Sequence, residues 1–324
     1  MAMASRAGWT VSSLYVLVSW TACAPAMHAH TAPQSDVPAA AAPVRAPSRA
    51  ERQALRFQAM EAYRKKDWAT CAQRFDRAHD LYGSACCHAQ AGDRDPAFAL
   101  LVRAIDDGLR DQDLERDSDL EPLHDDPRWP RELAHMAAKA AERSKTLNAE
   151  LIQIHHDDQA DRAVGAYEKI DWAKVAPRDQ ARRTRVDEIL AAGGAKAADD
   201  YYHAAMVYQH GNSPDEIQRA HDLAVRAVEL DPAHDAARWL AAASEDRKLM
   251  YEHKPQKWGT QYKKLDGTWV VWEVDPAITD AARAEWNVQP LAAAQAFVDR
   301  MNAALNAQKN AHAAPAEAHP ANAR

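Results

Sequence analysis

Residues 62–108 have the sequence AYRKKDWATCAQRFDRAHDLYGSACCHAQAGDRDPAFALLVRAIDDG, in which one short phrase occurs twice. The turn Lys66-Asp67-Trp68 corresponds to Gly92-Asp93-Arg94, at a distance of 26 residues. After each turn come a small, a large apolar and a second small residue, namely Cys71, Phe75 and Ala78 in the first copy and Ala97, Leu101 and Ala104 in the second. This spacing predicts two helix–turn–helix pairs whose second helices pack on their partners.

The repeated phrase resembles the tetratricopeptide repeat. That repeat is about 34 residues long, so the helix between the two phrases here must be short. Residues 106–129 are similar to the segment that closes such arrays in exported bacterial proteins, and the resemblance covers about residues 49–140. It implies a concave face for a peptide or a neighbouring domain. Because stable arrays need about three repeats, packing against the rest of this chain is an equal alternative.

The composition favours helices and excludes some classes of partner. The chain has 324 residues, only 10 glycines and a net charge of −7. Alanine, leucine, arginine and glutamate lose little on entering a helix, and a balanced charge does not suggest nucleic-acid binding. Past the first 26 residues, no stretch is apolar enough to cross a membrane. We therefore predict a mainly α protein, with helical hairpin repeats followed by a helical C-terminal domain that contains one β-hairpin.

The first 26 residues have the order of a secretory signal peptide. Arg6 precedes the apolar run 9–20, and Ala24 and Ala26 offer a small-x-small cleavage site. The run is too short to span a bilayer as a mature helix. We expect a periplasmic or secreted protein.

Two low-complexity segments flank the predicted fold. Residues 27–48 are rich in proline and alanine, which is typical of an extended linker, and residues 309–324 have a similar composition and predict a disordered tail. We do not expect a lipid anchor at Cys23, because Trp20 stands where a lipoprotein signal has leucine.

Export would permit disulfides among the three remaining cysteines. Cys71 could pair with Cys86 or Cys87, whereas adjacent cysteines rarely bond to each other. We favour the interpretation that all three are small buried residues on helix faces, since free cysteine is among the most buried residue types.

Charged residues interrupt two apolar stripes of the C-terminal region. A long helix is predicted from about residue 130 to 165, and its stripe continues into Asp158 and Arg162. In a later helix, Asp246 and Arg247 occupy a stripe that is otherwise apolar. Burying a charge is costly unless it is paired, so the two conflicts predict a polar site. The alternative is a structural ion pair between helices, Asp158 with Arg247 or Asp246 with Arg162.

Two turns lie near these stripes in the sequence. Gln209-His210-Gly211 ends a helix, with Gly211 suited to a left-handed C-cap and His210 favoured by the helix dipole. Asp266-Gly267 predicts a type I′ hairpin within residues 259–274, which sets Leu265 opposite Thr268. A two-stranded ribbon is stable only against other elements, so we expect it to cover the helices that carry the charged pairs.

The ordered set of polar motifs resembles a bacterial family known only as a domain of unknown function. The signature is Asp158-Gln159-x-x-Arg162, Gln209-His210, Asp246-Arg247 and Pro255-Gln256-x-x-Gly259-Thr260-Gln261. The similarity covers about residues 145–295, within a predicted domain at 141–308, and implies a helical fold and a shared site. Trp258 stands where the family has tyrosine, and no activity comes with the resemblance.

Two functions remain compatible with the sequence. The first is a protein- or peptide-binding module acting through the repeat region. The second is a hydrolase-type enzyme in which His210 is the acid/base, Arg162 and Arg247 hold an oxygen, and Asp158 and Asp246 orient them. Five further residues would bind a ligand at such a site, namely Gln159, Gln256, Gly259, Thr260 and Gln261. No HExxH or other metal motif occurs, so we expect neither a metal nor a cofactor. An enzyme should open these groups to a cleft, whereas a binding module should bury them and expose an apolar groove on residues 49–140.

Overall fold

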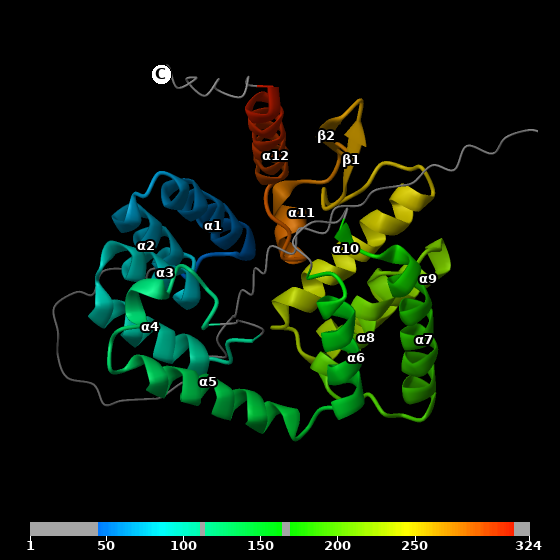
Figure 1. Cartoon of the computed structure of the whole chain (residues 1–324), viewed down its shortest axis with the longest axis horizontal. Coiled ribbons are helices and arrows are strands. Elements are labelled where there is room, and N and C mark those ends of the chain that lie inside the picture. Colours follow the sequence, from blue (N-terminus) through cyan, green and yellow to red (C-terminus); the bar gives the residue numbers. More distant parts are fainter. Residues whose placement is uncertain (1–44, 111–113, 164–168, 314–324) are drawn as a thin grey trace, which may run out of the picture.

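The computed structural model describes residues 45–110, 114–163 and 169–313, and its regular elements are nearly all helices (Figure 1). The prediction of a mainly helical chain with one β-hairpin is confirmed. No described helix combines the length and the apolar character that a membrane crossing requires. The predicted signal peptide and residues 27–44 of the predicted linker lie outside the described residues.

The N-terminal unit consists of four helices, each packed on the next. They are α1 (Arg49–Arg64), α2 (Trp68–Arg77), α3 (Leu81–Ala91) and α4 (Arg94–Asp106). The first begins with a capping box, in which Ser48 and Glu51 bond each other's backbone N–H groups. The small and large residues of the repeated phrase face inward, and Cys71, Ala97 and Leu101 are fully buried.

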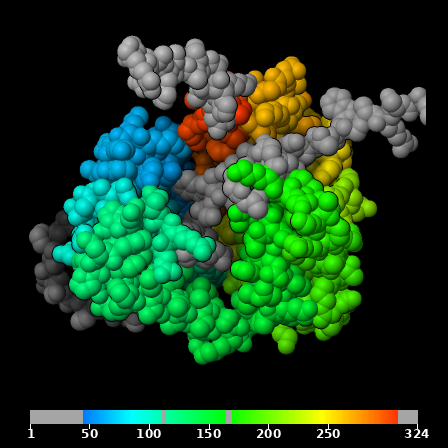
Figure 2. Space-filling view, in the orientation of Figure 1, coloured from blue at the N-terminus to red at the C-terminus, as the bar shows by residue number. Residues whose placement is uncertain are grey.

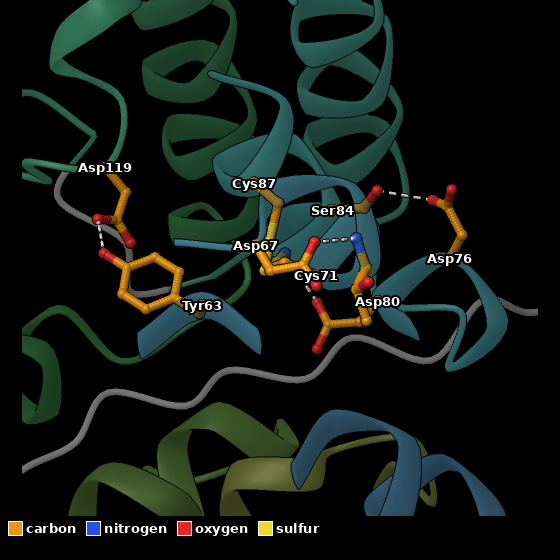
Figure 3. Close-up of a disulfide and its surroundings, with 10 residues drawn as sticks. Tyr63, Asp67, Cys71, Asp76, Asp80, Ser84, Cys87 and Asp119 are labelled. Atoms are coloured by element: carbon orange, nitrogen blue, oxygen red, sulfur yellow. Dashed lines mark hydrogen bonds between the residues drawn. A yellow bond between two sulfur atoms is a disulfide. The ribbon is translucent and has the colours of Figure 1, made fainter. Parts of the chain in front are cut away.

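A disulfide joins α2 to α3 between Cys71 and Cys87, whose Cα atoms lie 5.9 Å apart (Figure 3). The expectation that all three cysteines are free is therefore wrong. Cys86, the next residue on α3, is buried as a free thiol. Successive residues on a helix point in different directions, so only Cys87 can face α2 while Cys86 faces elsewhere.

A closing segment, residues 114–123, follows the four helices and ends in the 3-10 turn η1 (Glu121–Leu123). Leu114, Leu120 and Leu123 anchor it in the core shared with α3 and α4. Helix α5 (Trp129–Ser144) then runs from this unit to the C-terminal helices (Figure 1).

The single long helix predicted over residues 130–165 is wrong. The chain breaks after Ser144 and restarts as α6 (Ala149–Ala160). Asn148 caps the new helix, because its side chain accepts from the N–H groups of Glu150 at 2.9 Å and Leu151 at 3.1 Å. A strong N-cap inside an apolar stripe thus starts a second helix at a new angle.

The C-terminal unit contains α7 (Trp172–Ala191), α8 (Ala198–Gln209), α9 (Pro214–Leu230) and α10 (Asp235–Tyr251). Helix α9 packs between α8 and α10, and α6 covers α8. The core of this unit is built mainly from alanine and aliphatic side chains of these helices. Small side chains let the helix axes approach closely.

The β-ribbon, β1 (Tyr262–Leu265) with β2 (Thr268–Val271), is antiparallel and has the predicted register, with Leu265 opposite Thr268. Both turn residues have positive φ, 48° for Asp266 and 80° for Gly267, as a type I′ turn requires. The short α11 (Asp280–Glu285) and α12 (Leu291–Ala313) follow, and α12 packs on β2. The ribbon (orange) lies at the surface beside α12 (red) in Figure 2. Since α12 continues to Ala313, the predicted tail cannot begin at residue 309.

The two units are joined by polar contacts as well as by α5. Arg49 of α1 pairs with Asp235 of α10 at 3.0 Å, and the side chain of Gln53 on α1 donates to that of Asn287, which follows α11 in the sequence. On the side of α4, Arg110 pairs with Asp199 of α8 at 2.8 Å. One side of α1 is therefore committed to the C-terminal unit.

Candidate functional site

The first polar centre surrounds Asp158, whose side chain is fully buried on α6. His210, at the end of α8, places Nδ1 2.7 Å from Asp158 Oδ2. Arg162 reaches back to Asp158 Oδ1 at 3.0 Å and forward to Asp179 of α7 at 2.5 Å. Burial opposes ionisation of Asp158, but the charge and hydrogen bond of His210 and the charge of Arg162 outweigh it, so its pKa is lowered. The centre ties three helices together.

Further polar groups complete the shell of this first centre. Gln159 donates its amide to Asp158 Oδ2 at 2.9 Å. Arg182 of α7 bonds Asp179 at 3.0 Å and Asp161 at 2.6 Å. Asp161 follows α6 directly, so the arginine closes a chain of alternating charges between α6 and α7. Such a chain compensates the cost of burying each charge.

The second polar centre surrounds Asp246 of α10, which is also fully buried. Its Oδ1 accepts the N–H groups of Lys257 at 2.8 Å and Trp258 at 2.9 Å. Its Oδ2 accepts the N–H of Thr260 at 3.0 Å and the hydroxyl of the same residue at 2.8 Å. Burial raises the pKa of Asp246, and these four hydrogen bonds oppose the shift. Three N–H donors converge on the two oxygens, and through them Asp246 fixes the loop that leads into the ribbon.

Gln256 and Gln261 brace the base of the ribbon. The amide of Gln256 donates to the carbonyls of Gln261 at 3.0 Å and Trp272 at 2.8 Å, and its Oε1 accepts the N–H of Gln261 at 2.8 Å. Gln261 in turn donates to the carbonyl of Ala243 on α10 at 3.2 Å. Both glutamines are buried. Their side chains satisfy backbone N–H and C=O groups at the base of the ribbon that the two strands do not bond to each other.

Gly259 is required by backbone conformation and by space. Its φ is +86°, and a Cβ there would lie 3.1 Å from Leu291 Cδ1 of α12. A side chain would therefore be strained by the left-handed backbone and also crowd α12. Gly211 differs from the prediction, because it is not left-handed. A Cβ at Gly211 would lie 2.5 Å from Glu216 Cβ, so the glycine permits close packing of α9 rather than a C-cap.

The two centres meet at the end of α8 and on α10. Arg247 donates to the carbonyl of Gln209 at 2.8 Å, and Ser244 donates to Gln209 Oε1 at 2.9 Å. The predicted cross-helix pairs, Asp158 with Arg247 and Asp246 with Arg162, are wrong. Asp246 and Arg247 are adjacent on α10, so their side chains diverge: the first faces the ribbon loop and the second faces α8.

Solvent barely reaches the four side chains that an enzyme would use at these centres. The side chain of His210 is 2% exposed and that of Arg162 6% exposed. Arg247 and Gln261 are each 6% exposed. A buried carboxylate–imidazole pair can hold and move a proton, but an imidazole with this exposure offers a substrate almost no access.

Two acids of α8, one buried and one partly buried, escaped the sequence analysis. Asp200 of α8 accepts N–H groups of three residues, Asn148 at 2.7 Å, Lys196 at 2.9 Å and Ala197 at 3.0 Å. It thus holds the start of α6 against the start of α8. Its place three residues after the N-cap is a capping-box position, a signal that could have identified it.

The second missed acid is Asp199, which lies between Arg110 and His234. His234 Nε2 is 2.9 Å from Asp199 Oδ1, and Arg110 is 2.8 Å from the same oxygen. Burial opposes ionisation of Asp199, but the hydrogen bond of His234 and the charge of Arg110 prevail and lower its pKa to about 2. Nearby, the buried Nδ1 of His203 has no hydrogen-bond partner among the described residues, and burial lowers the pKa of this imidazole. Arg110 and His234 are far from α8 in the sequence, and no local signal joins them to Asp199.

The side chains of α1 and α3 that face the closing segment are already engaged. Tyr63 donates its hydroxyl to Asp119 (Figure 3), and Tyr82 donates to Asp117. Gln90 bonds the carbonyl of Asp119 at 3.0 Å. Burial raises the pKa of Asp119. The repeat-like helices therefore pack here against their own chain, which is the alternative left open by the sequence.

An apolar groove on residues 49–140 was expected of a binding module. Within the described ranges, the large hydrophobic side chains with high exposure lie elsewhere, namely Trp172, Leu230, Trp239 and Leu265. In the same part of the chain, no three or more His, Cys, Asp or Glu side chains gather so that they could hold a metal ion.

Comparisons with known proteins add no assignment. No protein-family model, curated protein or solved structure matches this chain. The resemblances to the tetratricopeptide repeat and to the family with the polar signature therefore remain predictions.

Proposed function

We propose that this chain is an exported protein- or peptide-binding module, with tetratricopeptide-like helices before a helical domain of the signature family. One observation carries the proposal: the residues that an enzyme would need at an open cleft are buried. Asp158 and Asp246 are fully buried, and their oxygens are used to hold helices and the ribbon loop. Buried, fully bonded polar networks rigidify a domain and specify one arrangement of its helices.

The same observation locates the partner's contact away from the inner side of α1 and α3. Those side chains bind the closing segment or the C-terminal unit, as Tyr63 does through Asp119 and Arg49 through Asp235. Because the inner sides of these helices already bind other parts of the chain, we assign the partner's contact to the β-ribbon at the surface.

A peptide library tests the binding function. The full chain without residues 1–26 is immobilised and panned against displayed random peptides, and enriched sequences are synthesised. We expect at least one soluble peptide to bind saturably by fluorescence anisotropy, while its scrambled counterpart does not. Enrichment no better than that on an uncoated surface would refute the proposal.

A hydrolase is the second candidate, favoured by the 2.7 Å contact between Asp158 and His210. An acid that orients a histidine is the arrangement used by many general bases. The test compares the native chain with His210→Gln on ester, peptide and phosphoester substrates, after the unfolding midpoints of both have been measured. Hydrolysis by the native chain that the folded variant lacks would establish the enzyme and overturn a purely binding role. Equal rates at the background level would support the binding module.

A further inference from the structure

The β-ribbon has two outer edges, and the register assigns the backbone groups on each. The N–H of Trp272 donates to the carbonyl of Gln261 at 3.0 Å, so the carbonyl of Gln261 faces β2 and marks this position as a hydrogen-bonded pair of the ladder. Bonded and non-bonded pairs alternate along an antiparallel ladder. Tyr262 and Lys264 are therefore in non-bonded pairs, and their N–H and C=O groups point outward from β1.

The outer edge of β2 is covered by a side chain. Asn302 of α12 accepts the N–H of Trp269 at 2.8 Å and donates to the carbonyl of the same residue at 2.8 Å. This amide pairs with the backbone as a further strand would. The outward groups of Tyr262 and Lys264 on β1 have no such cover among the described residues. An edge with unpaired groups is a template for one more strand.

The side chains of β1 define the charge that this edge favours. Lys263 lies over the ring of Trp272 at 4.3 Å, and Lys264 lies over that of Trp269 at 5.4 Å. Both ammonium groups are thus held in place by aromatic rings. Neither has a carboxylate at salt-bridge distance within the described ranges, whereas Lys254 and Lys257 below them are paired with glutamates.

A second copy of this chain is a poor occupant for the edge. Pairing β1 with β1 would set lysines beside lysines, and like charges on adjacent strands are destabilising. An acidic strand would instead meet two lysines that have no acidic partner. Leu265, at the end of β1, is 55% exposed and adds an apolar contact.

We propose that the open edge of β1 binds an acidic peptide in extended conformation, adding a third strand to the ribbon. This inference rests on the proposed binding function and names its contact and its partner class. The backbone groups of Tyr262 and Lys264 supply affinity, and Lys263 and Lys264 select acidic sequences over basic ones.

A matched pair of variants tests the edge. Lys264→Pro removes the outward N–H without breaking a hydrogen bond inside the ribbon, whereas Lys264→Thr removes the same charge and keeps that N–H. The probe is a fluorescein-labelled hexapeptide of alternating glutamate and valine, and a lysine–valine hexapeptide is the control. We expect the acidic probe to bind Lys264→Pro about tenfold more weakly than Lys264→Thr, the loss of one backbone hydrogen bond. The basic probe should not bind.

Amide hydrogen exchange on the native chain gives a second, variant-free reading. Saturating acidic probe should slow exchange at Tyr262 and Lys264 and leave Lys263 unchanged, because the N–H of Lys263 already faces β2. Equal binding of the probe by both variants, with no added protection at Lys264, would refute binding at the edge of β1. It would leave the proposed binding function of the chain untouched. A probe that does not bind saturably would overturn the inference, and the library experiment would then decide the binding function separately.

Discussion

Replacing Asp246 by asparagine tests how strongly the buried carboxylate holds the ribbon. Each oxygen accepts two donors, from Lys257 and Trp258 on one side and from Thr260 on the other. Asparagine keeps one oxygen for two of these donors. Its NH₂ group can face Thr260 and donate to the hydroxyl oxygen, so the hydrogen bond from the N–H of Thr260 is the one that is lost. The loss of this hydrogen bond should destabilise the loop by roughly 1.5–3 kcal/mol.

Glu245 provides the matched control for this experiment. It is the preceding residue on α10 and contacts the same loop through the side chains of Lys257 and Trp258. It is partly exposed, and exposed ion pairs contribute about 0–1 kcal/mol. Glu245→Gln should therefore change little, although it removes one negative charge from nearly the same place.

Hydrogen exchange at the amides of Lys257, Trp258 and Thr260 is the direct measurement, with urea unfolding as the global one. In Asp246→Asn these amides should exchange at least about tenfold faster, as a loss of about 1.5 kcal/mol requires. The reasoning fails if the two variants accelerate exchange equally, or if Asp246→Asn leaves these amides as protected as in the native chain.

Three further perturbations have defined outcomes. Replacing Cys71 and Cys87 by alanine should lower the free energy of unfolding by about 3 kcal/mol in urea, as expected for a closed loop of this size, and an unchanged midpoint under oxidising conditions would contradict the link. His203→Phe should reduce the loss of unfolding free energy that occurs on acidification. The imidazole has a lowered pKa in the folded chain, so protonation below about pH 6.5 favours the unfolded chain, by up to about 1.4 kcal/mol per pH unit. An identical slope in native chain and variant between pH 7 and 5 would contradict this. Gly259→Ala should lower the free energy of unfolding more than Gly267→Ala does. Both glycines have positive φ, but only at Gly259 would the added Cβ make a close contact. Equal unfolding midpoints would contradict this, because they would mean that Leu291 of α12 moves aside at no cost.

Local chemistry made several elements predictable from the sequence. The β-hairpin register follows from Asp266-Gly267, since a two-residue turn with positive φ determines which residues face each other. The burial of Asp158 and Asp246 followed from helical periodicity, because each continues an apolar stripe. The broken helix at Asn148 was also a local signal, but the apolar stripe across it concealed the cap.

The partners of the buried charges depended on the tertiary structure. Periodicity indicates that Asp246 and Arg247 lie near an inward face, but not which neighbour each one meets. The structure directs Asp246 to the ribbon loop and Arg247 to α8, while His210 takes the place beside Asp158 that a second arginine was expected to fill.

The cysteines show the same division between sequence and structure. Sequence alone allowed Cys71 to pair with Cys86, with Cys87 or with neither, and the packing of α2 on α3 chose Cys87. By itself the sequence determined the helical class, the ribbon and the positions where charge enters the core, because these depend on residues a few positions apart. Which groups then meet depends on how each helix rotates about its axis as it packs, and a difference of one residue turns a side chain by about 100°.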